Sequence, residues 1–389
     1  MSATPGLAGR ALLVNPGARP ERATEPPSRA PLAVHRRLPG YAVTPLVEAP
    51  ALARANGVAR VWVKDESWRL GLPAFKMLGA SWAAYRAVVE RLGRDPEPWA
   101  SLDELRRVLG PLRPLTLAAA TDGNHGRAVA RMATLLGAGA EIFVPEGTSS
   151  ARTAAIEGEG ARVTVVDGDY DAAVSAAASR AGERCLVIAD IAWPGYEQVP
   201  TWVVEGYATI FWEVEDQLAT LGGERPDVVV VPVGVGALAA AAVRHYRRRG
   251  LEHRPRLIGV EPLAAACVLR SLRAGRIVTV PGPHHSIMAG LNCGTPSLVA
   301  WPLLMTGLDA VVAVADGRAR QAMRDLAAVG VVAGETGAAS LAGLAEVTTG
   351  PGADQVRRAL GLGADARVLL LCTEGATDPE AYRRIVAGD

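Results

Sequence analysis

Lysine is almost absent from this 389-residue chain. Only Lys64 and Lys76 are lysines among its 41 basic residues, and all the others are arginines. Arginine stays protonated in proteins, whereas a buried lysine can lose its proton and become a nucleophilic amine. The two lysine positions are therefore the first places to look for chemistry that arginine cannot perform.

Other scarcities exclude whole classes of protein. The net charge is only +1, so the strongly positive surface of a nucleic-acid-binding protein is missing. No apolar run approaches the ~20 residues of a membrane span, and the N-terminus lacks a hydrophobic signal core, so we expect a cytoplasmic protein. The four cysteines have no CxxC or other metal-type spacing, which predicts reduced thiols and no metal site.

The chain does contain a regular alternation of short apolar runs with alanine-rich segments. The runs expected to form strands are 61–65, 115–120, 141–145, 161–166, 186–190, 227–233, 256–261, 310–314 and 367–372. The segments expected to form helices include 79–92, 125–137, 170–181, 237–249, 318–329 and 338–348. Nearly continuous apolar strands that alternate with helices predict an α/β fold, in which helices cover both faces of parallel sheets.

A glycine-rich turn follows the expected strand 227–233. Ligands of parallel α/β sheets bind in such turns, beyond the carboxyl ends of the strands. Glycine lets the backbone approach an anion closely, and the N–H groups at the start of the next helix point towards it. We therefore interpret the turn formed by Gly234, Val235, Gly236 and Ala237 as a phosphate cradle, the alternative being a purely steric tight turn. The stretch also satisfies a relaxed dinucleotide fingerprint, with Glu261 ending the next strand, so an NAD(P)-dependent dehydrogenase is an alternative.

Lys76 lies between two bulky apolar residues, Phe75 and a methionine, just before an expected helix. Such neighbours penalise the charged ammonium and favour the neutral amine, which forms a Schiff base with a carbonyl cofactor such as pyridoxal phosphate. The alternative is a lysine that reaches from a helix start to solvent. The phosphate cradle and the scarcity of lysine favour the Schiff base. We expect Lys64 to be structural and paired with Asp65 or Glu66.

The stretch TDGNHG, residues 121–126, follows another expected strand. Its glycines permit close backbone approach, and Asn124 can hydrogen-bond a ring hydroxyl. Asp122 can cap the following helix, which is the more common fate of such an aspartate. It can also act as a general acid or base if an apolar pocket raises its pKa. The position of Asp122 alone leaves both roles open.

Taken together, these stretches resemble the fold type II pyridoxal-phosphate enzymes, the class of threonine dehydratase and tryptophan synthase β. The aspartate in the second position of TDGNHG is similar to one branch of that class, the diaminopropionate ammonia-lyases. The resemblance extends over roughly residues 40 to 385. The stretches that carry it are AFKMLG (74–79), TDGNHG (121–126), DIAWPGYEQVPTWVVEGYATI (190–210), PVGVGALA (232–239), IMAGLNCGTPS (287–297), GETGAAS (334–340) and CTEGATD (372–378).

The resemblance implies which residues hold pyridoxal phosphate. Lys76 would form the Schiff base, Asn124 would bond the cofactor's hydroxyl, and the turn 234–238 would wrap its phosphate. A neutral group would meet the pyridine nitrogen, which limits carbanion delocalisation and favours elimination over transamination. The remaining cofactor-binding residues would be Phe75, Glu335, and Thr373 or Cys372, one of the last two facing the pyridine nitrogen.

The reaction that the resemblance implies is the α,β-elimination of 2,3-diaminopropionate to pyruvate and ammonia. Asp122 and Asp190 match two aspartates that the family places near the substrate, and each could serve the proton transfer for one α-carbon stereoisomer. A serine or threonine dehydratase and a β-replacement enzyme are alternatives that would use the same lysine. A paralogue that binds the cofactor without catalysis is disfavoured by the intact Lys76, Asp122 and Asp190.

The resemblance also implies two domains, each with a mainly parallel twisted sheet flanked by helices. We expect a large cofactor-binding domain formed by 41–79 plus 193–389, and a small domain formed by 80–192. Residues 1–40 are rich in proline, arginine, alanine and glycine and predict a loosely ordered arm. The expected assembly is a homodimer that acts on a small amino acid, with no nucleic-acid or membrane partner.

Overall fold

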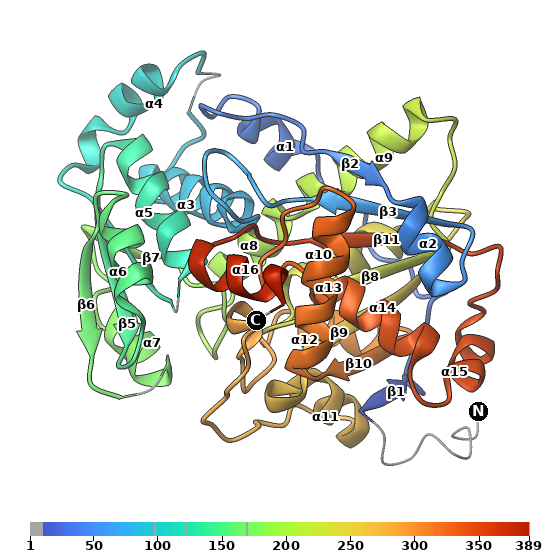
Figure 1. Ribbon diagram of the computed structural model, residues 1–389. Coiled ribbons are helices and arrows are strands. Elements are labelled where there is room, and N and C mark those ends of the chain that lie inside the picture. Colours follow the sequence, from blue (N-terminus) through green and yellow to red (C-terminus); the bar gives the residue numbers. More distant parts are fainter. Residues whose placement is uncertain (1–10, 97–98, 122, 169, 389) are drawn as a thin grey trace. The chain divides into compact units, whose positions relative to one another are not determined.

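The computed structural model describes residues 11–96, 99–121, 123–168 and 170–388 (Figure 1). Contacts within the chain divide it into two compact units. Unit 1 comprises Met1–Ser28, Val43–Trp68 and Ile210–Asp389, and unit 2 comprises Arg29–Ala42 and Arg69–Thr209. Each unit is built around its own sheet and therefore has its own hydrophobic core.

Unit 1 contains a seven-stranded sheet in the order β1-β10-β9-β8-β11-β3-β2. Its strands are β1 (Leu12–Val14), β2 (Leu46–Glu48), β3 (Arg60–Asp65), β8 (Val228–Pro232), β9 (Arg256–Pro262), β10 (Ala310–Val314) and β11 (Arg367–Cys372). The five inner strands are parallel, and the two edge strands β1 and β2 run antiparallel to their neighbours. Every residue of β8 and β10 is buried, as expected for strands covered on both faces.

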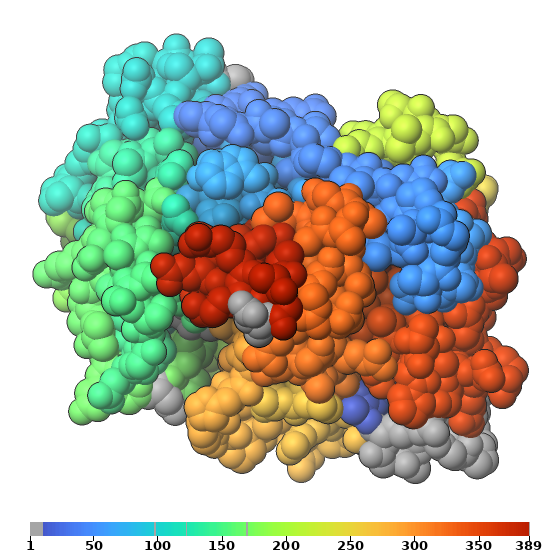
Figure 2. Space-filling view, in the orientation of Figure 1, coloured from blue at the N-terminus to red at the C-terminus, as the bar shows by residue number. Residues whose placement is uncertain are grey.

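The helices of unit 1 surround this sheet. They are α2 (Pro50–Asn56), α9 (Ala208–Thr220), α10 (Ala237–Tyr246), α11 (Cys267–Ala274), α12 (Trp301–Gly307), α13 (Asp316–Ala328), α14 (Ala339–Thr349), α15 (Ala353–Leu360) and α16 (Pro379–Ala387), and the first two residues of α9 belong to unit 2. Helix α14 is buried along most of its length, whereas only Ile385 of α16 is buried. Helix α16 accordingly lies on the molecular surface, in red in Figure 2.

Unit 2 contains a four-stranded sheet in the order β6-β5-β4-β7, and all its strand pairs are parallel. The strands are β4 (Thr116–Ala120), β5 (Gly139–Pro145), β6 (Arg162–Val166) and β7 (Cys185–Val187). The helices are α1 (Ala30–His35), α3 (Lys76–Leu92), α4 (Leu102–Val108), α5 (Asn124–Leu136), α6 (Ser150–Glu157), α7 (Tyr170–Ala178) and α8 (Gln198–Gly206). Alanines of β4 and α7 line its smaller core, which lets the helix approach the sheet closely.

The expected α/β class with parallel sheets is confirmed. The structure differs from the expectations in the N-terminal segment and in the boundaries of the units. The first described residues of the expected arm form β1, and Asn15 donates hydrogen bonds to the carbonyls of Met305 and Leu308, so this part is tied to unit 1. The unit boundaries also differ from the expected ones. Helix α3 begins at Lys76 and is continuous, so no boundary falls at residue 79.

In the part of the chain that the structure describes, none of the helices is long and apolar enough to cross a membrane. Within the same residues, no group of three or more histidine, cysteine, aspartate or glutamate side chains is placed to hold a metal ion.

The close packing of α14 on β9 gives a test of the core of unit 1. A Cβ on Gly343 would lie 2.2 Å from Cγ2 of Val260. Gly343→Ala should therefore lower the free energy of unfolding by about 1–3 kcal/mol, as overpacked cores do. The matched control is Gly317→Ala in α13, where nothing lies within 4 Å of the added Cβ and helix propensity favours alanine by up to about 1 kcal/mol. Denaturant unfolding of both variants measures the difference, and equal effects would contradict the packing argument.

Candidate active site

Lys76 is the first residue of α3, and its side chain is paired rather than merely surrounded by apolar groups. Its Nζ donates a hydrogen bond to Oδ2 of Asp190 at 2.6 Å. The side chains are 20% and 8% exposed, so the pair is partly shielded from water yet reachable. The Phe75 ring lies 5.7 Å from Nζ, as the apolar flank in the sequence suggested. The sequence predicted a neutral amine from this apolar flank alone. The carboxylate of Asp190 favours the charged ammonium instead.

Asp190 lies after β7 and is held in its ionised form. Burial raises the pKa of this carboxyl, but the positive charges of His125 and Lys76 and the hydrogen bond from Lys76 outweigh it, so the pKa lies well below its usual value. His125 accounts for part of this because its Nδ1 lies 3.8 Å from Oδ2 of Asp190. Its Nε2 hydrogen-bonds the carbonyl of Ile188 at 2.7 Å, which fixes the ring. The same interactions make this carboxylate a weak base for as long as the Lys76 ammonium is paired with it.

The TDGNHG turn connects β4 to α5, as the sequence predicts. Asn124 is the first residue of α5, and the N–H of Gly123 donates to Oγ1 of Thr121 at 3.0 Å. A Cβ on Gly126 would lie 2.2 Å from Cγ2 of Thr121, so only glycine fits at that position. Asp122 lies outside the described residues, and its role stays a prediction.

In unit 1, the turn between β8 and α10 has the geometry of an anion site. Gly236 is the N-cap of α10 with φ of 99°, a left-handed conformation that favours glycine. A Cβ there would also lie 2.5 Å from Cδ1 of Leu304. The first N–H groups of a helix have no intrahelical acceptor and carry a partial positive charge. Residues 234–238 therefore present backbone donors that suit a phosphate.

The end of β11 carries the two candidates for a neutral partner of a cofactor ring. Oγ1 of Thr373 donates to the carbonyl of Thr336 at 3.3 Å, and Sγ of Cys372 donates to the carbonyl of Glu374 at 3.5 Å. Burial and the charges of nearby carboxylates raise the pKa of the Cys372 thiol well above its usual value. Cys372 belongs to the hydrophobic core of unit 1. Both groups are neutral at physiological pH.

Sequence reasoning missed Glu374, which fixes the neighbouring GETG turn. Its Oε1 accepts a hydrogen bond from the N–H of Thr336 at 3.1 Å, and its carbonyl accepts one from the N–H of Gly334 at 3.0 Å. A Cβ on Gly337 would lie 2.2 Å from that same carbonyl oxygen. Glu374 therefore holds the turn that contains the half-buried Glu335 against the end of β11. The motif CTEGATD contained the residue, but nothing local in it signalled the partner 38 positions away.

A family model described as "Pyridoxal-phosphate dependent enzyme" matches residues 37–374. Diaminopropionate ammonia-lyase of Salmonella typhimurium is 36% identical over 366 residues, which are 91% of this chain and 90% of that protein. The Escherichia coli K12 protein of the same name is 38% identical over 362 residues, 90% of this chain and 89% of that protein. The chain belongs to the diaminopropionate ammonia-lyase family of pyridoxal-phosphate-dependent enzymes.

Solved structures of this family support the assignment. Diaminopropionate ammonia-lyase from Escherichia coli in complex with D-serine aligns with a TM-score of 0.86 at 35% identity, covering 96% of each chain. The same enzyme in complex with an aminoacrylate-PLP azomethine reaction intermediate aligns with a TM-score of 0.85 at 34% identity, again over 96% of each chain. The expected fold type II class and the expected cofactor, pyridoxal phosphate, are therefore confirmed.

The dehydrogenase alternative is wrong, and the structure shows what its acidic residue does. Both carboxylate oxygens of Glu261 accept hydrogen bonds from backbone N–H groups at the start of α11, those of Val268 and Leu269, at 2.8 Å each. Burial raises the pKa of Glu261 to about 7. A fully buried side chain engaged with a helix start is not available to a ribose hydroxyl.

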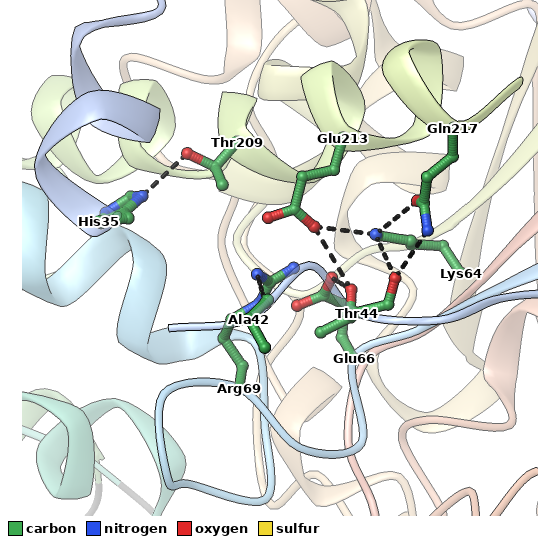
Figure 3. Close-up of polar contacts among 9 residues, drawn as sticks. All are labelled: His35, Ala42, Thr44, Lys64, Glu66, Arg69, Thr209, Glu213 and Gln217. Atoms are coloured by element: carbon green, nitrogen blue, oxygen red, sulfur yellow. Dashed lines mark hydrogen bonds and ion pairs between the residues drawn. The ribbon is translucent and has the colours of Figure 1, made fainter. Parts of the chain in front are cut away.

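Lys64, the second lysine, is structural as expected, but it forms its ion pair with a residue far away in the sequence. Its Nζ donates to Oε2 of Glu213 at 2.8 Å, Oε1 of Gln217 at 2.9 Å and the carbonyl of Thr44 at 2.9 Å (Figure 3). The expected pairing with Asp65 or Glu66 did not consider α9, which supplies Glu213 and Gln217. Glu66 accepts a hydrogen bond from Oγ1 of the same Thr44 at 2.6 Å.

Removing the charge of Lys64 should destabilise the fold strongly. Lys64→Met would remove the cation that lies 2.8 Å from the buried Glu213 carboxylate, and the free energy of unfolding should fall by about 3–5 kcal/mol. Arg60→Met in the same strand is the control, because Arg60 is 37% exposed and forms surface ion pairs worth about 0–1 kcal/mol. Denaturant unfolding checks both variants. A loss below about 1 kcal/mol for Lys64→Met would show that the cluster contributes little.

Proposed function

We propose that the chain catalyses the α,β-elimination of ammonia from 2,3-diaminopropionate, and that water hydrolyses the released aminoacrylate to pyruvate and a second ammonia. The observation that carries the proposal is the hydrogen bond between Lys76 and Asp190, an amine and an ionised carboxylate beside each other in a partly shielded site. Two relatives that are 36% and 38% identical to this chain are diaminopropionate ammonia-lyases, which supports the same substrate. A dehydratase or a β-replacement enzyme would use the same pair, so the choice of substrate is what the experiments must test.

Each unit, taken by itself, contains described residues that suit pyridoxal phosphate. The fit rests on the positive-φ glycine Gly236, whose missing Cβ leaves room at the start of α10 for a phosphate, and on the accessible amine of Lys76. Lys76 would be the point of covalent attachment, with Asn124 at the ring hydroxyl. Thr373 is the better partner for the ring nitrogen because Cys372 belongs to the core of unit 1. The remaining proposed contacts are Phe75, Glu335, Gly234, Val235, Ala237 and Leu238.

When bound, pyridoxal phosphate supplies an electron sink that stabilises negative charge at the substrate's α-carbon. The chain must then move protons. The basicity of Asp190 rises once the Lys76 amine is committed to the cofactor, so we propose that Asp190 accepts the α-proton of one stereoisomer and that Asp122 serves the other. The β-amino group leaves readily only when it is protonated, so a carboxylic acid beside it accelerates the elimination.

Replacing Lys76 tests the cofactor site. The purified protein should carry a yellow chromophore that borohydride reduces, and Lys76→Ala should lose it. Lys76→Arg is the matched control for charge: it keeps the positive group but cannot form the imine, so it should also lose the chromophore. Absorbance before and after reduction checks this. A chromophore unchanged in Lys76→Ala would overturn the site.

Replacing the two aspartates tests the substrate and the proton transfer. Asp190→Asn and Asp122→Asn should each retain the chromophore and lower kcat by roughly 10²–10⁴-fold for one isomer of diaminopropionate more than for the other. Asp171→Asn, at an exposed position of α7, is the control and should change neither rate. Ammonia and pyruvate release from D- and L-diaminopropionate and from serine measures the rates.

Three results of this experiment would contradict the proposal. Faster turnover of serine would favour a dehydratase, and a new amino acid in place of pyruvate when nucleophiles are supplied would favour β-replacement. If both variants turn over both isomers as fast as the wild-type protein does, neither aspartate transfers the proton. The homodimer and the cytoplasmic location expected from the sequence stay predictions.

A further inference from the structure

The hydroxyl of Tyr207 is a fully buried polar group with no hydrogen-bond partner among the described residues. The side chain is 1% exposed and lies at the C-terminal end of α8. Leaving a buried hydroxyl without a partner destabilises a fold, because the group has lost its bonds to water. Such groups are rare in native proteins and each needs a specific explanation.

The surroundings of Tyr207 place this hydroxyl beside the proposed active site. Its ring packs against Phe75, the residue before Lys76, with ring centroids 4.7 Å apart. Its Cζ, the atom that carries the hydroxyl, lies 2.7 Å from the position that a Cβ on Gly79 would take. Gly79 is three residues after Lys76 and so lies on the same face of α3. The absent side chain of Gly79 is what makes room for the phenol.

The electrostatics of Tyr207 agree with this placement. Burial raises the pKa of its phenol well above the usual value, the charge of Lys76 lowers that pKa, and the charge of Asp190 raises it. The hydroxyl therefore stays protonated, and among the described residues it is a hydrogen-bond donor without an acceptor.

Asp190 is the acceptor that will need a donor. In the structure, its Oδ2 accepts a hydrogen bond from Nζ of Lys76. If Lys76 is the point of cofactor attachment, its amine is committed elsewhere in the loaded enzyme and Asp190 loses that charged donor. Of the contacts described above it then keeps His125, whose Nδ1 at 3.8 Å from Oδ2 is beyond hydrogen-bond distance, so a new donor would stabilise the buried carboxylate.

We propose that Tyr207 is a positioning residue, whose hydroxyl donates a hydrogen bond to the Asp190 carboxylate in the cofactor-loaded enzyme and so keeps it ionised and oriented. This inference rests on the proposed roles of Lys76 and Asp190. A hydrogen bond formed in the loaded enzyme would give this buried hydroxyl the partner that the described residues do not supply.

Tyr207→Phe tests the proposal because it keeps the ring and removes only the hydroxyl. In cofactor-free protein, removing an unsatisfied buried group should raise Tm by roughly 2–4 °C. In the holoenzyme that gain should disappear, because the hydroxyl is then bonded. The kcat for diaminopropionate should fall about 10- to 100-fold with KM little changed, as for the loss of a hydrogen bond to a charged group.

The matched control is Tyr246→Phe, which changes a buried tyrosine of α10 whose hydroxyl is not among the unsatisfied groups. It should neither raise Tm nor change kcat. A Tyr207→Phe variant with unchanged kcat, or with a lower Tm in cofactor-free protein, would overturn the proposal. If the wild-type protein carries the chromophore but does not turn over diaminopropionate, the proposed function fails first, and the positioning role fails with it.

Discussion

The desolvation of parallel strands is the constraint on which the rest of this structure depends. Strands such as β8 and β10 are buried along their whole length, so they cannot carry reactive side chains. Chemistry is confined to the places where these strands end. The glycine turn follows β8, Thr373 follows β11, and Asp190 lies shortly after β7. This is why a chain with so apolar a core can still present polar groups for a cofactor.

The two lysines show how environment divides one residue type between two tasks. Lys64 is fully buried and engages three acceptors, which compensate its charge and leave its amine no freedom. Lys76 has a carboxylate partner and partial access to solvent, so its amine can leave that partner for a ligand. The same scarcity in the sequence singled out both positions. Burial and the acceptors around each amine, which the sequence does not display, distinguish the structural lysine from the one that we propose as reactive.

Features that depend on local pattern were predictable, and those that depend on distant partners were not. The apolar runs predicted the inner strands, and the glycine spacing predicted the turn before α10. The ion pair of Lys64 with Glu213 joins residues 149 positions apart, and no periodicity reports such a contact. The role proposed for Tyr207 was not predictable for the same reason, because it depends on packing against Phe75 and Gly79. The three-residue strands β1 and β2 are too short to show alternation.

Those two short strands have a consequence for how the chain can associate. They occupy both edges of the seven-stranded sheet and run against the direction of their neighbours. An edge of three residues offers too few free backbone groups to recruit another strand, which protects a sheet from growing into a fibre. Two copies of this chain would therefore not join by extending this sheet across an interface. At these two edges, any contact between copies would have to come from helices and loops, whose side chains can specify a single partner.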